Sequence, residues 1–187
     1  RPVNPEPGRE VMRIRPASQQ DGDDIRRIYT SAFPEEECEI VARLAMGLLS
    51  ENATPQSISL VAESDGPVVG HAAFSPVGID SHEDCRAYIL APLAVLAGYQ
   101  GRGTGSALVE HGMQRLSDMR VNIVFVYGDP EYYERFGFNA DAARSYVPPY
   151  ELQYPSGWQA AVFKECDIDN TQVAISCVAA LRDPALW

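Results

Sequence analysis

The chain has 187 residues, of which 45% are hydrophobic and 22% charged, as in a globular protein with one well-buried core. Its 15 Lys and Arg residues stand against 26 Asp and Glu residues, which gives a formal net charge of −11. Nucleic acids and anionic membranes are bound through basic surfaces, so we predict neither as a partner. The charge favours cationic partners such as amines, although acidity also serves solubility.

The cysteine and histidine residues show no spacing typical of a metal-binding site. Cys38, Cys85, Cys166 and Cys177 lack metal-binding spacing, and the three histidines are equally scattered. We therefore predict free thiols in a reducing cytoplasm, with no metal ion. No apolar stretch approaches the length of a membrane-spanning helix, and no signal peptide is visible.

The first half of the chain predicts an arm, a strand, two helices and a β-hairpin. Residues 1–9 contain three prolines and are predicted to be a loose arm before a domain over 10–187. A helix capped by Ser18 or Asp21 is ended by Pro34. The predicted strand, the second helix and the two hairpin strands span 11–15, 35–49, 58–63 and 68–76.

The second half alternates strands and helices, which predicts an α/β domain with a mixed sheet. The two strands at 87–95 and 121–127 are expected to be parallel, because a helix over 103–119 joins them. The remaining predicted elements are a short helix at 131–136 and strands at 158–163 and 172–178.

A glycine-rich loop lies between the strand at 87–95 and the following helix. It reads QGRGTG over 100–105. Exposed backbone N–H groups that open a helix bind anions, so a phosphate or pyrophosphate is the expected guest. A P-loop is excluded because no Gly-Lys pair precedes Ser or Thr. A dinucleotide fingerprint is approximated by Gly101, Gly103 and Ser106, with Asp129 further on, but that motif should follow its strand directly and open the fold.

Two segments resemble the GCN5-related N-acetyltransferase (GNAT) family. In LAVLAGYQGRGTGSALVEHG, the residues Gln100, Gly103 and Gly105 match the family's Gln/Arg-x-x-Gly-x-Gly/Ala signature. In GDPEYYERFGF, Tyr133 stands four residues before the Gly137-Phe138 pair, as in the family's later motif. The resemblance covers 11–165, leaves 166–187 as a C-terminal extension, and is closest to uncharacterised bacterial acetyltransferases with a YYxRFGF segment.

This resemblance implies an α/β (α+β) GNAT-like domain with a mixed, mostly antiparallel central sheet and a splayed parallel strand pair flanked by helices. It also implies acetyl-CoA as cosubstrate, bound where the two parallel strands separate. The pantetheine amides would pair with the strand backbone, and the pyrophosphate would lie on the glycine loop. The implied cofactor-binding residues are Leu93, Ala94, Val95, Gln100, Gly101, Arg102, Gly103, Thr104, Gly105 and Ser106.

The implied reaction is direct acetyl transfer to a primary amine of a small cationic molecule or a protein. A backbone N–H near Leu93 would stabilise the oxyanion. Tyr133 would protonate the departing CoA thiolate; the alternative is that Tyr133 only packs on the cofactor, like Tyr132. No general base is assigned, and the helices over 21–50 are expected to select the acceptor.

Several alternatives stay open at this stage. Asp129 either caps the following helix, which we favour, or contacts the cofactor. The fold could serve as a non-catalytic acyl-CoA sensor or interaction domain, and a nucleotide-dependent oxidoreductase is a third function. Family members commonly dimerise, so a homodimer is compatible with the resemblance, but no feature of the sequence indicates one.

Overall fold

A computed structural model describes residues 11–169 and 172–187; the arm predicted over 1–9 lies outside these ranges. The described residues form strands, helices and several 3-10 turns. In chain order the main elements are β1 (Met12–Pro16), α1 (Gly22–Ala32), α2 (Glu35–Ser50), β2 (Ile58–Ser64), β3 (Val68–Ile79), β4 (Ala87–Val95), α3 (Thr104–Asp118), β5 (Ile123–Tyr127), α4 (Pro130–Tyr133), α5 (Ala140–Ala143), β6 (Tyr146–Val147), β7 (Trp158–Val162) and β8 (Val173–Cys177).

One mixed sheet organises the described part of the chain. Its main path runs β1-β2-β3-β4-β5-β7, and β8 pairs with the far end of β3 and with β6. Within the main path the β4–β5 contact is parallel and its neighbours are antiparallel. The fold predicted from the resemblance, a mostly antiparallel sheet with a parallel pair, is therefore confirmed.

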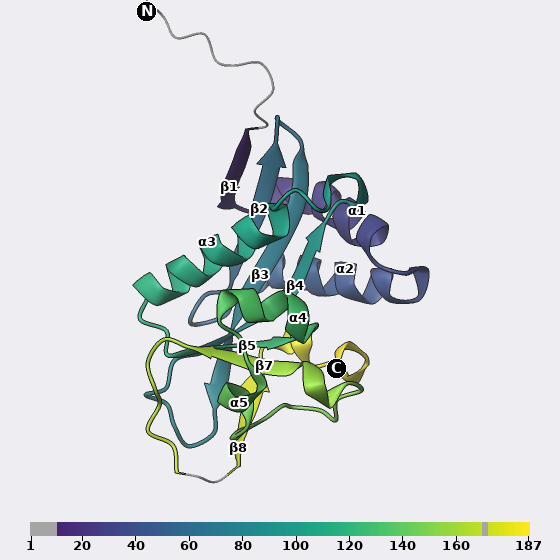
Figure 1. Cartoon of the computed structure of the whole chain (residues 1–187). Helices are drawn as coiled ribbons and strands as arrows, with labels where there is room; N and C mark the ends of the chain where they lie inside the picture. The colour runs from purple at the N-terminus through teal and green to yellow at the C-terminus, as the bar shows by residue number, and fades with distance from the viewer. Residues whose placement is uncertain (1–10, 170–171) are drawn as a thin grey trace, which may run out of the picture.

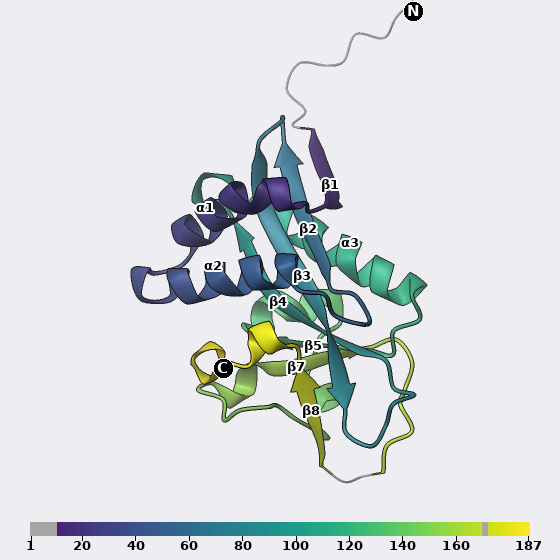
Figure 2. The ribbon, with the colours of Figure 1, turned by 180° about the vertical axis from the view of Figure 1, so that it is seen from behind.

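Helices cover both faces of this sheet. Figure 1 shows α3 and α4 over one face, and Figure 2, seen from behind, shows α1 and α2 over the other. The face under α3 is closed tightly, because a Cβ atom on Gly112 would lie only 2.1 Å from the Phe74 ring. On the opposite face, Leu44 and Leu48 of α2 join a core cluster with Phe125 of β5 and Trp158 of β7. These two packed layers hold β4 and β5 in the middle of the molecule.

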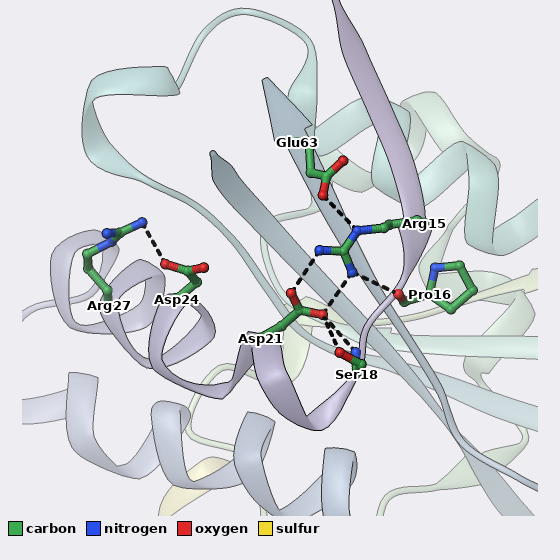
Figure 3. A network of polar contacts seen from close by, with 7 residues as sticks. All are labelled: Arg15, Pro16, Ser18, Asp21, Asp24, Arg27 and Glu63. Carbon is green, nitrogen blue, oxygen red and sulfur yellow. Dashed lines mark hydrogen bonds and ion pairs between the residues drawn. The ribbon is translucent and has the colours of Figure 1, made fainter. Parts of the chain in front are cut away.

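A polar network fixes the start of α1 to the edge of the sheet (Figure 3). Arg15 of β1 donates from Nη1 and Nη2 to the two carboxylate oxygens of Asp21, both at 2.8 Å, and from Nε to Glu63 at 2.7 Å. The backbone N–H of Ser18 also donates to Asp21, at 2.7 Å. The hydrogen bond from Arg15 is the main reason that the pKa of Asp21 falls to about 2, and burial of this carboxyl works against that fall. The network therefore keeps Asp21 ionised at the N-terminus of the helix.

The cysteine prediction is wrong for two of the four residues. Cys85, just before β4, forms a disulfide with Cys166, which follows β7, and their Cα atoms lie 5.6 Å apart. The two residues are 81 positions apart in the chain, so no local spacing reveals the pair. Cys38 and Cys177 are free and buried.

The predicted elements agree with the structure at each strand and helix named from the sequence, with ends shifted by a few residues. The short helix predicted at 131–136 is divided into α4 and a following 3-10 turn over Glu134–Phe136. The sequence reasoning missed β6 and α5, which have only two and four residues. Elements this short carry too few residues for a periodic pattern.

Candidate functional site

The parallel strands β4 and β5 separate halfway along β4. Their pairing ends at Leu90 and Val126, while β4 continues to Val95. On the other side, β4 stays paired with β3 through a bulge, in which Ala91 and Pro92 stand opposite Ala73. In the described structure, the edge of β4 beyond Leu90 that faces β5 therefore has no partner strand.

A cleft of about 480 Å³ opens at this separation. One side, which we call the backbone wall, is the chain from Leu93 to Ser106, that is, the end of β4, the glycine loop and the first turn of α3. The other, which we call the side-chain wall, consists of Tyr132 and Arg135. The lining residues are Ala32, Phe33, Leu93, Ala94, Val95, Tyr99, Gln100, Gly101, Gly103, Thr104, Gly105, Ser106, Tyr132 and Arg135.

The backbone wall requires glycine at three positions, for two different physical reasons. Gly101 and Gly103 have φ values of 75° and 82°, which side chains disfavour, and open space surrounds both positions. Gly105 has no such φ, but a Cβ atom there would lie 2.7 Å from the Tyr132 hydroxyl. Gly103 is also the N-cap of α3 and supplies no side-chain cap. The first N–H groups of the helix are therefore open to a ligand.

The side chains of Gln100 and Arg102, two of the implied cofactor-binding residues, lie in different places. Gln100 lines the cleft, but its side-chain amide donates to the carbonyl of Val95 at 3.0 Å and so closes the loop onto the end of β4. Arg102 is not among the lining residues; its guanidinium carbon lies 5.2 Å from the centre of the Tyr99 ring. The other implied cofactor-binding residues all lie along the cleft.

In the side-chain wall, Tyr132 was expected to pack on the cofactor, whereas Arg135 was not predicted from the sequence. Tyr132 crosses from α4 to the start of α3, where it hydrogen-bonds with the Ser106 side chain. Burial raises the pKa of Tyr132, and this hydrogen bond partly opposes the shift. Arg135 stacks on Tyr132, with its guanidinium carbon 4.7 Å from the ring centre, and donates from Nε to the Tyr132 carbonyl at 2.9 Å.

Tyr133, the predicted general acid, lies beside the cleft and is not among its lining residues. Its ring covers Gly128, where a Cβ atom would lie 2.6 Å away, and packs edge-on against Phe138. Leu93, which does line the cleft, packs against the same hydrophobic cluster. Burial raises the pKa of Tyr133, so the phenol stays protonated at neutral pH.

The C-terminal end of α1 brings Ala32 and Phe33 to the cleft. A buried chain of hydrogen bonds holds this helix down: the Tyr29 hydroxyl lies 2.7 Å from His71 Nδ1, and the Ser59 hydroxyl lies 2.7 Å from His71 Nε2. Burial lowers the pKa of His71 to about 3, so the imidazole is neutral and both of its nitrogens are satisfied by hydroxyls. Tyr29 also packs against Phe33, with ring centres 5.9 Å apart, which couples this buried chain to the cleft.

Asp129 lies outside the cleft lining. Asp129 caps α4, since its carboxylate accepts from the Glu131 N–H at 3.0 Å, which is the favoured alternative. Over residues 11–169 and 172–187, no group of three or more His, Cys, Asp and Glu side chains is arranged to hold a metal ion. Within the same ranges, no helix has both the length and the apolar character needed to cross a membrane.

Comparison with known proteins shows that this chain is similar to acetyltransferases. Residues 13–140 match the family model described as an acetyltransferase (GNAT) domain. An uncharacterised N-acetyltransferase of Escherichia coli K12, YjhQ, is 39% identical over 135 residues, which cover 71% of this chain and 72% of YjhQ.

Two solved structures resemble this one over most of their length. The GNAT family N-acetyltransferase YhbS of Escherichia coli, crystallised with CoA, has a TM-score of 0.79 and 26% identity, and the match covers 96% of both chains. A GNAT family acetyltransferase of Brucella melitensis, crystallised with acetyl-CoA, has a TM-score of 0.65 and 33% identity, covering 91% of this chain and 97% of its own.

Proposed function

The chain belongs to the GNAT family of acetyltransferases, and we propose from this premise that it transfers the acetyl group of acetyl-CoA to a primary amine. One observation carries the proposal: the unpaired edge of β4 and the open N-terminus of α3 meet in a single cleft. A strand edge offers hydrogen bonds to amide groups, and a helix N-terminus offers them to phosphates. Acetyl-CoA carries both kinds of group in one molecule.

The cofactor is proposed to lie along the backbone wall. Its pyrophosphate accepts hydrogen bonds from the N–H groups at Gly103 to Ser106, and its pantetheine amides pair with the β4 edge between Leu93 and Val95. This arrangement places the thioester at the point where β4 and β5 separate. Tyr133 borders that point from the α4 side, packed against the same cluster as Leu93.

The reaction is proposed to be a direct transfer. The neutral amine attacks the thioester carbonyl, and a backbone N–H near Leu93 stabilises the oxyanion that forms. The C–S bond then breaks, and the CoA thiolate takes the phenolic proton of Tyr133. The acetyl group stays on nitrogen as an amide, the nitrogen loses its extra proton to solvent water, and Tyr133 recovers a proton from the same solvent. Burial raises the pKa of this phenol, which keeps its proton in place at neutral pH and also makes it a weaker acid.

The acceptor is proposed to be a cationic amine, either a small molecule or an amine of a protein. The net charge of −11 favours the approach of cations. The end of α1 lines the cleft with Phe33, and α2 begins nearby with three exposed acidic residues, Glu35, Glu36 and Glu37. We propose the cytoplasm as the site of action, because acetyl-CoA is an intracellular metabolite.

Calorimetric titration with acetyl-CoA, followed by a screen of amines, tests the proposal. We expect saturable binding and acetylation of at least one amine. Failure of the folded protein to bind acetyl-CoA would contradict the proposed function. Binding without turnover on any amine would instead favour a non-catalytic acyl-CoA sensor on this fold.

The adjacent tyrosines provide a matched pair for the catalytic step. Tyr133→Phe should lower the single-turnover rate of acetyl transfer roughly 100-fold, as expected for loss of a general acid. Tyr132→Phe keeps the ring of the side-chain wall and should leave this rate close to that of the native protein. Equal rates in the two variants would remove Tyr133 from the role of acid.

A further inference from the structure

Arg135 stands out because it is the one charged residue among those lining the cleft. The chain carries a net charge of −11, yet no Asp or Glu is found among the same lining residues. A cleft that is free of carboxylates and holds one guanidinium favours an anionic ligand.

The guanidinium of Arg135 is held in a fixed orientation. Its Nε donates to the Tyr132 carbonyl at 2.9 Å, and its guanidinium carbon lies over the Tyr132 ring, 4.7 Å from the ring centre. Tyr132 is fixed in turn by its contact with the start of α3 at Gly105 and Ser106. An arginine oriented in this way loses less conformational entropy on binding than a freely moving side chain.

The terminal nitrogens of Arg135 remain available to a ligand. Four other arginines, Arg15, Arg26, Arg27 and Arg144, form ion pairs with carboxylates. Within residues 11–169 and 172–187, Arg135 has no such carboxylate partner, and its side chain is exposed at the cleft. Paired N–H groups of this kind match the geometry of a phosphate.

We infer that Arg135 is a second phosphate-binding group of the cleft, opposite the open N-terminus of α3. This inference rests on the proposed function, because the phosphate belongs to acetyl-CoA. The backbone wall and Arg135 would then hold the nucleotide end of the cofactor from two sides. The source of the phosphate is either the pyrophosphate or the 3′-phosphate, which offer the same chemistry to a guanidinium.

The position of Arg135 supports a contact at the outer end of the cofactor. Besides the main cleft, it lines a second hollow of about 350 Å³ with Glu110, Met113, Gln114, Ser117, Phe136 and Phe163. Arg135 therefore stands on the ridge between two hollows, on the α3 side of the molecule. A group bound by it would be at the margin of the cleft, beside this second hollow.

Arg135→Gln, with Arg144→Gln as a matched control, tests the inference. Arg144 is exposed and pairs with Asp141 away from the cleft, so its loss changes the net charge equally. Arg135→Gln should weaken acetyl-CoA binding by roughly 10- to 100-fold, the range expected for hydrogen bonds to a charged group. Arg144→Gln should bind acetyl-CoA like the native protein, and Arg135→Lys should lie between the two.

Three thioesters identify the group that Arg135 binds. If Arg135→Gln and the native protein bind acetyl-3′-dephospho-CoA with equal affinity, Arg135 binds the 3′-phosphate. If the variant still binds that thioester more weakly but binds acetyl-pantetheine as well as the native protein does, Arg135 binds the pyrophosphate. Dissociation constants are measured by calorimetry, and for the weaker acetyl-pantetheine by ligand-observed NMR.

Two results would overturn the inference while leaving the proposed function intact. One is unchanged acetyl-CoA affinity in Arg135→Gln. The other is a loss of affinity for acetyl-pantetheine in Arg135→Gln that equals its loss of affinity for acetyl-CoA, which would show that Arg135 only supports Tyr132. A native protein that binds no acetyl-CoA would instead remove the proposed function, and the inference with it.

Discussion

The two walls of the cleft are built from different parts of the protein. The backbone wall offers N–H groups from a strand end, a glycine loop and a helix start, and its shape depends on positive φ angles at Gly101 and Gly103. The side-chain wall depends on how Tyr132 and Arg135 stack on one another. A backbone wall requires particular residues at particular positions, so it leaves a motif in the sequence. A side-chain wall depends on tertiary packing and leaves a much weaker signal.

The largest expected effect comes from breaking the backbone wall with Gly103→Glu. A carboxylate at the N-cap of α3 would occupy the open space at the loop and repel a phosphate, so acetyl-CoA affinity should fall by more than about 100-fold. Calorimetric titration measures this loss.

Gly66→Glu serves as the control for that variant. Gly66 also has a positive φ, 114°, and open space around it, but it lies in the turn between β2 and β3. Both variants should lose about 1–2 kcal/mol of unfolding free energy from the strained backbone. Equal acetyl-CoA affinity in the two variants would show that the phosphate does not lie on the α3 N-terminus.

The disulfide joins the halves of the sheet that carry the two walls, at the end of β4 opposite the cleft. Cys85 precedes β4 and Cys166 follows β7, so the Cys85→Ser variant removes the covalent link between the two halves at this point. We expect the free energy of unfolding to fall by about 2–4 kcal/mol, the usual range for a native disulfide. Urea unfolding with and without dithiothreitol measures the change. The reductant should destabilise the native protein and leave Cys85→Ser unaffected; an equal response of both would contradict the disulfide.

The smallest expected effect concerns Asp21, which anchors the α1 helix that reaches the cleft at Phe33. Its pKa is lowered from 3.8 to about 2, so its ionised form stabilises the fold. This contribution, roughly 2 kcal/mol, should be complete above about pH 4 and decline as the pH falls toward 2. Asp21→Asn should therefore be less stable than the native protein at pH 7, and the difference should shrink over that window.

Asp24→Asn is the matched control for Asp21→Asn. Asp24 forms an exposed pair with Arg27 on the same helix, at 3.0 Å, and such pairs contribute little. Urea unfolding between pH 2 and 7 compares the two variants. A pH-independent difference between Asp21→Asn and the native protein would mean that the Arg15 network does not lower this pKa.

The sequence predicted the backbone wall of the cleft much better than the side-chain wall. The periodicity of 103–119 and the alternation of the strands predicted the main elements, and the QGRGTG loop predicted the backbone wall. Tyr132 was expected only to pack on the cofactor. The sequence could not show that Tyr132, and not Tyr133, lines the cleft, because adjacent residues on a helix point about 100° apart. Arg135 was missed for the same reason. The disulfide was missed because folding alone brings together two cysteines 81 residues apart.

The separation of β4 from β5 has a consequence beyond ligand binding. Past Leu90, the side of β4 that faces β5 has no partner strand, as in an edge strand, although β4 lies in the middle of a sheet. Edge strands of this kind are templates for pairing with another chain, and proteins usually protect them with charges, prolines or covering loops. Here the bound cofactor would provide the protection. The empty protein should then pair with another chain at this strand edge more readily than the protein that holds acetyl-CoA.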